Sequence, residues 1–284
     1  MGKKLFNVFL KGLLAGIAIS LGGLIFIMTR KHIDNFVAGA YLFSTGLILV
    51  CNFGYFLYTG KICYLIDELK KKEKPNYVLQ LIIGYLGNVV GAFAFGLINK
   101  AVLTMPDFVQ PMIDSKVNDS WYGLIIKGVF CGVLIFLAVE GFKKSKTDIG
   151  KYVILVLCVG AFIVCGFEHS IADAFYFSLS NDIASTIVPL LLITLGNTIG
   201  GLLFPAIYLL IGKEVNKGKM YDSLAKTLSC KKSIKANMSI TELEVKALME
   251  KLDSCKMPYT CPHGRPTIIK FTKYELEKMF KRVM

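Results

Sequence analysis

Long apolar runs alternate with short polar connections over most of the chain. A helix needs roughly 20 apolar residues to cross a hydrocarbon core about 30 Å thick, and six runs reach or approach this length. They lie at about residues 8–29, 36–59, 77–98, 121–140, 152–178 and 184–212. After Gly212 the sequence becomes basic and mostly polar. We therefore predict an all-α membrane domain of six transmembrane helices in residues 1–212 and a separate tail in residues 213–284.

The composition supports a membrane protein with basic ends. Hydrophobic residues make up 54% of the sequence and the formal net charge is +13, which does not fit one soluble core. The first run follows Lys3 and Lys4, as in a signal peptide. It is longer than the apolar region of a signal peptide, however, and it lacks a clear cleavage site. We expect it to be retained as the first helix.

The positions of Lys and Arg predict which side of the membrane each connection faces. One connection contains "KKKEK", the next but one contains "FKKSKTDIGK", and both ends of the chain are basic, whereas "SLSNDIAS" has no cation. By the positive-inside rule, this places both termini in the cytoplasm, in a multi-pass protein of a bacterial-type inner membrane. The segment "TRKH" after the first run opposes this assignment, because it puts cations on the outer side.

Two short patterns occur twice and in the same order. "YLGNVVGAF" at 85–93 matches "TLGNTIGGL" at 194–202, and "LVCNFGYF" at 49–56 matches "IVCGFEHS" at 163–170. The pairs predict two homologous halves of three helices each, which enter the membrane from opposite faces. Such inverted repeats are common in transporters, whose substrate path lies between the halves. Gly-rich segments could instead serve close helix packing, but the paired matches favour the repeat.

Several ionisable residues lie in or beside the apolar runs. His169 lies within the fifth run, where an ionisable side chain is by default functional, although a histidine bonded to a backbone carbonyl is the alternative. Lys116 precedes the fourth run and could face a pore or extend outward to the interface. We expect Glu168 and Asp173 to support a helix break rather than to carry protons.

The chain resembles the formate/nitrite transporter family over about residues 5–212. The resemblance is carried, in order, by "GLILVCNFGYFLYTG", the two "LGN" segments with "DSKVNDSWYGLIIKG" between them, and "GFEHSIADAF". It implies an aquaporin-like inverted 3+3 repeat with the second and fifth helices broken, assembled as a homopentamer with one pore per protomer. It also implies a channel or transporter for small monovalent anions, namely formate, nitrite or hydrosulfide, with no enzyme activity and no cofactor for transport.

The resemblance also implies pore or substrate roles for individual residues. The residues concerned are Phe43, Leu47, Leu57, Tyr58, Thr59, Lys116, Phe162, His169 and Asn197. The two leucines match the cytoplasmic constriction and the two phenylalanines match the outer one. The histidine matches the central histidine, with the lysine behind it and the asparagine on the sixth helix. Tyr58 stands where the family's gating loop carries Phe.

Two departures from the family leave the substrate open. Gly132 and Asp173 stand where the family usually has Asn. The substrate preference of formate or nitrite members therefore cannot be carried over, and hydrosulfide stays an alternative substrate. A bare anion pays a large desolvation cost in an apolar constriction, whereas its neutral acid pays much less. We expect Lys116 to attract the anion and His169 to donate a proton or a hydrogen bond. Burial disfavours a charged imidazole, so His169 is not expected to be permanently charged.

The tail resembles a different family. "SCKKSIKAN", "CPHGRPTII" and "YELEKMFKR" are similar to the C-terminal end of the mismatch-repair MutL family, over about residues 220–284. The resemblance implies part of an endonuclease metal site at Cys230, Cys261 and His263. Two thiolates and an imidazole could also form part of a zinc site by their chemistry alone, with Cys255 as a candidate fourth ligand. The family's Asp-Gln-His-Ala motif and its ATPase domain are absent from this sequence. We therefore do not expect the tail alone to cut DNA.

The tail also shows weak patterns of secondary structure. Helical spacing at 241–252 and the strand-like "PTIIKF" predict a small α+β cytoplasmic unit. It could be a fused remnant, the product of a misassembled sequence, or a basic appendage with a regulatory role. A MutL-type endonuclease fragment carried on a membrane segment is the alternative function, and a membrane anchor without a pore is a third. No nucleic acid is expected to bind the membrane domain.

Overall fold

The structure is a computed structural model, which describes residues 2–69, 77–232, 239–254 and 272–280. For residues 212–232 it describes the helix but not the side chains. The chain divides into two compact units, Met1–Leu210 and Ile211–Met284.

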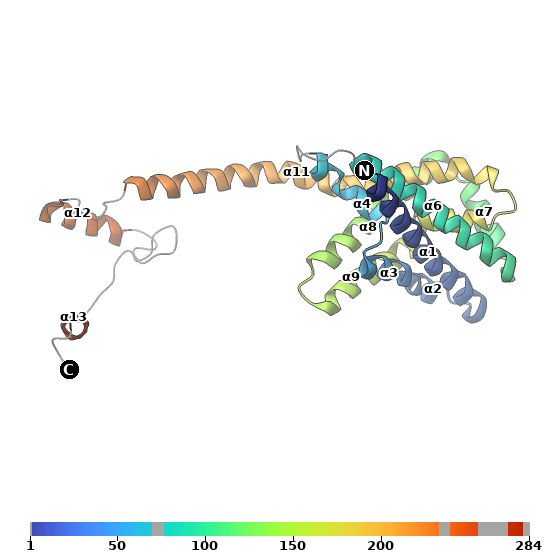
Figure 1. The fold of residues 1–284 in the computed structure, drawn as a ribbon, viewed down its shortest axis with the longest axis horizontal. Helices are drawn as coiled ribbons and strands as arrows, with labels where there is room; N and C mark the ends of the chain where they lie inside the picture. The colour runs from blue at the N-terminus through green and yellow to red at the C-terminus, as the bar shows by residue number, and fades with distance from the viewer. Residues whose placement is uncertain (1, 70–76, 233–238, 255–271, 281–284) are drawn as a thin grey trace. The chain divides into compact units, whose positions relative to one another are not determined.

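The described residues form helices and no strands (Figure 1). In the first unit these are α1 (Gly2–Ile33), α2 (Phe36–Leu42), α3 (Ser44–Phe53), α4 (Tyr58–Lys61), η1 (Ile62–Tyr64), α5 (Leu65–Leu69), α6 (Tyr77–Val102), α7 (Val109–Val117), α8 (Trp121–Lys144), α9 (Asp148–Val164), α10 (Ser170–Ser178) and η2 (Ala184–Thr186). The long α11 (Ile187–Lys232) continues into the second unit, which also contains α12 (Glu242–Asp253) and α13 (Lys273–Met279). The predicted strand "PTIIKF" lies outside the described residues, so the α+β tail stays a prediction.

The predicted count of six membrane spans is not confirmed. Five helical segments of the described chain are long and apolar enough to cross a membrane: Gly2–Ile33, Phe36–Phe53, Tyr77–Val102, Trp121–Lys144 and Ala184–Ile211. The predicted fifth span, 152–178, instead contains α9 and α10, separated by residues 165–169. A left-handed Gly166, at φ 68°, and the polar residues after it interrupt the helix there.

Glycines allow the long helices to approach closely in matching places. α1 packs along α6, and a Cβ atom on Gly12 would meet the backbone of Gly84 at 2.6 Å. α8 packs against the start of α11 in the same way, because a Cβ on Gly128 would lie 2.8 Å from the carbonyl oxygen of Ile193. Both "LGN" segments are therefore held against a glycine-bearing helix.

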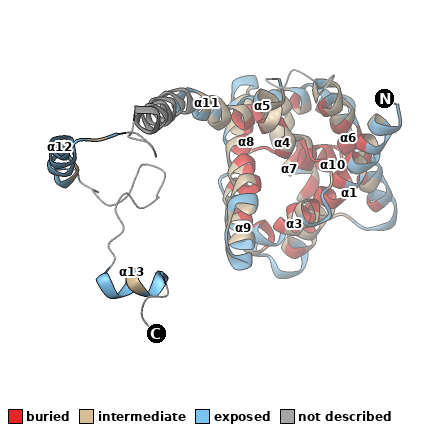
Figure 2. Cartoon of the chain, turned by 60° about the vertical axis from the view of Figure 1, so that its left-hand side comes forward, coloured by how far each residue is buried: buried red, intermediate tan, exposed pale blue. Residues whose placement is uncertain are grey.

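The short helix α10 lies in the buried centre of the first unit. All nine of its residues are buried, and it packs against α6, α1 and α7. Figure 2 shows the buried positions gathered around it, with exposed positions on the outer faces of the long helices. Many of those exposed positions are Leu, Ile, Val and Phe, as expected for surfaces that meet lipid or another protomer.

Candidate functional site

The first helix break lies between α3 and α4 and is held by Asn88 of α6. α3 ends at Gly54, which adopts a left-handed conformation with φ 65°. The amide oxygen of Asn88 accepts the N–H of Tyr58, and its amide nitrogen donates to the carbonyls of Phe56 and Gly12, all at 2.8 Å. Asn88 is fully buried. We call these three hydrogen bonds the Asn88 bracket. They hold the backbone on both sides of Leu57, at Phe56 and Tyr58.

The second break lies between α9 and α10 and is held by Asn197 of α11. Its amide oxygen accepts the N–H of Ser170 at 2.9 Å, and its amide nitrogen donates to the carbonyls of Glu168 at 2.8 Å and Gly128 at 2.9 Å. Asn197 is also fully buried. Both N–H groups of this amide donate to backbone carbonyls, and we call the set the Asn197 bracket. Asn197 therefore positions the backbone at His169 and does not line the cavity that His169 faces.

The two brackets correct the alignment of the second repeated pattern. Sequence identity pairs Cys51 with Cys165, a shift of 114 positions. The hydrogen bonds instead pair Leu57 with His169, a shift of 112, and the same shift superposes the two left-handed glycines. The identity-based register is therefore wrong by two residues, because backbone conformation and not the cysteine is what the two segments share.

His169 is the capping residue of α10 and is held at both ring nitrogens. Its Nδ1 accepts the backbone N–H of Ala172 at 3.3 Å, and its Nε2 lies 2.8 Å from Oγ1 of Thr59. An accepting Nδ1 in a neutral ring leaves the proton on Nε2, which then donates to the threonine. His169 is 2% exposed and Thr59 is fully buried. The predicted histidine and threonine are thus in direct contact across the two breaks.

Lys116, on α7, reaches the same centre. Its Nζ contacts Glu168 and lies 3.0 Å from Oδ1 of Asp173. The two acidic residues therefore do lie at the break, and both pair with the lysine. Oδ2 of Asp173 is buried and makes no hydrogen bond with the described part of the chain.

A cavity of about 270 Å³ opens beside this cluster. Its lining includes Phe43, Phe162, Lys116, His169 and Asp173. The two phenylalanine rings meet edge to face with centroids 6.0 Å apart, and the Phe162 ring lies 5.9 Å from the imidazole. The structure therefore brings four residues predicted for the pathway into one place, which we call the His169 cavity.

A second cation, Lys127, also lines the His169 cavity but is already paired. It lies 2.7 Å from the Asp119 carboxylate, in the connection between α7 and α8. The hydrogen bond from Lys127 lowers the pKa of Asp119 below its ordinary value. Lys127 therefore adds little uncompensated charge.

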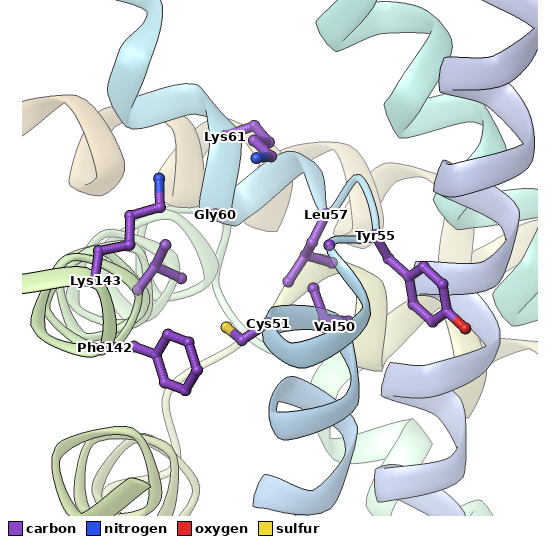
Figure 3. A pocket seen from close by; sticks show the side chains of 10 residues that line it. Val50, Cys51, Tyr55, Leu57, Gly60, Lys61, Phe142 and Lys143 are labelled. Carbon is purple, nitrogen blue, oxygen red and sulfur yellow. The ribbon is translucent and has the colours of Figure 1, made fainter. Parts of the chain in front are cut away.

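A second cavity, of about 160 Å³, is lined by Leu57 and its neighbours at the first break (Figure 3). Its wall includes Cys51 and Phe142, and Lys61 and Lys143 approach it from α4 and α8. Sequence reasoning did not select these two lysines. The signal available was that Lys61 follows the first break by one turn. We call this the Leu57 cavity.

Four predicted residues, Leu47, Tyr58, Thr59 and Asn197, line neither of these two cavities. Leu47 is 1% exposed and belongs to the apolar core. The hydroxyl of Tyr58 lies 2.8 Å from that of Thr198 and its ring packs on Tyr85, so it faces α11 and α6. Thr59 acts through its contact with His169.

The predicted metal site of the tail falls mostly outside the described residues. Cys261 and His263 lie there, and Cys230 lies in the part of α11 whose side chains are not described. Among the residues that the structure does describe, no group of His, Cys, Asp and Glu could hold a metal ion. The zinc site therefore stays a prediction.

A known protein family and two solved structures resemble most of the chain. A family model described as "Formate/nitrite transporter" matches residues 1–211. A solved "FNT family ion channel" superposes with a TM-score of 0.66 at 25% identity and covers 73% of this chain and 90% of its own. A solved "Pentameric formate channel with formate bound" gives a TM-score of 0.67 at 24% identity and covers 74% and 97%.

The curated relatives of this chain include mismatch-repair proteins. The MutL of Shouchella clausii (strain KSM-K16) is 51% identical over 76 residues, which are 27% of this chain and 12% of that protein. The MutL of Staphylococcus aureus (strain Newman) is 53% identical over 72 residues, or 25% and 11%. This chain thus spans about an eighth of the length of the curated relatives it matches.

Proposed function

Because the chain belongs to the formate/nitrite transporter family, we propose that its membrane unit conducts formate, nitrite or hydrosulfide across the bilayer. The observation that carries the proposal is a buried histidine, bonded to Thr59 across two helix breaks and facing a cavity that also holds a lysine. An ionisable residue at such depth is expensive and is retained where it serves a pathway. The unit is a conduit and not an enzyme.

The proposed path runs through both cavities. The Leu57 cavity is lined by Lys61 and Lys143, whose positive charge raises the local concentration of small anions, whereas Lys116 in the His169 cavity is paired with Glu168 and Asp173. Between the two cavities, Leu57 on one side and the Phe43–Phe162 pair on the other form apolar constrictions. An apolar constriction excludes hydrated ions and larger solutes. The central step is therefore the loss of hydration.

His169 lowers the cost of that step. Its Nε2–H, now directed at Thr59, is the hydrogen-bond donor that we assign to the passing anion, because a neutral imidazole that gave up this proton would become an imidazolate. A substrate that takes its proton from water crosses the constriction as a neutral acid, at a much smaller desolvation cost than the bare anion. Thr59 positions the ring and holds its hydrogen bond when no anion is present.

We extend the proposal to the assembly and its orientation. The solved formate channel that this chain superposes on is named as pentameric, and we propose a homopentamer with one pore per protomer. The matching brackets of Asn88 and Asn197 support the inverted repeat of two three-helix halves. The basic connections support cytoplasmic termini in a bacterial-type inner membrane, with the Leu57 cavity facing the cytoplasm.

The full chain in proteoliposomes is expected to carry at least one of formate, nitrite and hydrosulfide much faster than lactate or chloride. The apolar constrictions disfavour the bulkier lactate, and chloride cannot become a neutral acid near neutral pH. Uptake of each solute is measured by flux or by light-scattering of swelling vesicles, with protein-free vesicles as the control. Rates equal to those of empty vesicles for all three small anions would reject the proposed function.

For the tail we propose a remnant of a metal site that does not cut DNA. The support is the 51% identity to a MutL protein over 76 residues. Cys230, Cys261 and His263 supply three candidate zinc ligands. We expect the full chain to retain zinc after purification, to lose it in a Cys261→Ser variant, and to leave supercoiled DNA intact with Mn²⁺ or Zn²⁺. Metal-free protein at micromolar zinc would reject the site, and nicking would favour the endonuclease alternative.

A further inference from the structure

One partly buried lysine, with 15% of its side chain exposed, faces two carboxylates in the His169 cavity. Lys116 contacts Glu168 and lies 3.0 Å from Asp173, whose side chain is 1% exposed. If both acids were ionised, this three-residue cluster would carry one net negative charge. A buried, uncompensated charge is costly, and a negative one beside an anion path would also repel the substrate.

The neighbouring elements supply no second positive charge to balance the cluster. Arg30 of α1 lies over the ring of Phe108, with 4.2 Å from its guanidinium carbon to the ring centroid, and Lys127 of α8 is paired with Asp119. The other titratable groups that face the cluster are neutral in their ordinary forms: the imidazole of His169, the thiol of Cys131 and the phenol of Tyr176. Within the described structure, charge balance must therefore come from a proton.

The hydrogen bonds indicate where that proton belongs. Oδ2 of Asp173 is buried with no hydrogen-bond partner in the described chain, which is unfavourable for an ionised carboxylate. Two carboxyl groups that approach the same ammonium repel each other, and one proton held between them removes that repulsion.

We propose that Glu168 and Asp173 share one proton and that Asp173 thereby determines which substrates pass. With the proton, the cluster is neutral and the His169 cavity admits anions. Without it, the cluster is negative, permanent anions are excluded, and substrates that enter as neutral acids still pass. This inference rests on the proposed function.

Replacing Asp173 by Asn tests the inference because the amide has the same shape and no titrating proton. Flux of formate and of nitrate is measured in proteoliposomes between about pH 5 and about pH 9. At each pH, the flux through the wild-type protein is divided by the flux through the variant. Substrate protonation is the same for both proteins, so the ratio isolates the cluster. For nitrate we expect the ratio to fall by roughly tenfold at the alkaline end, and for formate to fall less.

Two further variants complete the test. Glu168→Gln also leaves one carboxylate, so like Asp173→Asn it should remove the loss of nitrate flux at alkaline pH. It replaces Asp173→Asn in the test if that variant fails to fold. Asp114→Asn changes an exposed acid on the same helix as Lys116 and should keep the wild-type profile. A ratio that is independent of pH for both cluster variants would overturn the inference. An inactive wild type would instead reject the proposed function.

Discussion

Replacing His169 by alanine is expected to reduce anion flux by roughly tenfold or more and to leave a residual flux that follows the concentration of the neutral acid as pH changes. In the wild-type protein, flux of a weak-acid anion should rise as pH falls, because protonation at the constriction becomes easier. The variant lacks the Nε2–H that now contacts Thr59. The flux that remains in the variant is carried by the neutral acid that already exists in solution.

The measurement is uptake of formate, nitrite and hydrosulfide by proteoliposomes over a series of pH values. His32→Ala is the matched control, because His32 is exposed near the end of α1 and lines neither of the two cavities. Thr59→Val should give an intermediate loss, since it removes the partner of the ring but leaves the imidazole. An unchanged rate and pH dependence in His169→Ala would exclude the proposed role of the histidine.

Much of the site could be predicted from local sequence. Long apolar runs locate the membrane helices, and a run that contains His169 and Glu168 signals an interruption, because polar groups at that depth need special partners. The repeated "LGN" pattern indicated matching positions on α6 and α11. Only the resemblance to a family, however, placed Lys116 at the same centre, since α7 is distant in sequence from the break it contacts.

Other features depend on three-dimensional contacts that no short pattern encodes. Sequence reasoning selected Asn197 but not Asn88, although each makes the same three hydrogen bonds to backbone. It also aligned the two breaks through a shared cysteine, whereas the structure aligns them through left-handed glycines. Side-chain identity drifts at such positions, while the need to satisfy a buried N–H and C=O does not.

The pairing of Lys116 with two acids was likewise not predictable from spacing alone. Glu168 and Asp173 are five residues apart, on either side of the start of α10, and face one lysine only because the helix begins between them. Sequence reasoning expected structural partners at the break, and the lysine was treated separately as a pore residue. The structure joins these two roles in one cluster.

Asn197→Ala is expected to lower the melting temperature by several degrees and to abolish most of the flux. The change leaves the N–H of Ser170 and the carbonyls of Glu168 and Gly128 without their partner in a buried region. Each orphaned buried group costs about 1–3 kcal/mol, although relaxation recovers part of this. The break would then no longer hold His169 at a fixed distance from Thr59.

The control is Asn99→Ala, because in the described structure that buried amide donates only to Phe95 on its own helix, and its loss should have a small effect. Asn197→Asp sharpens the test, since a carboxylate keeps the acceptor for Ser170 but presents negative charge to two carbonyl oxygens. We therefore expect Asn197→Asp to be at least as damaging as the alanine variant, measured by thermal unfolding in detergent and by flux. If Asn197→Ala matched Asn99→Ala in both assays, the bracket would not be what positions the histidine.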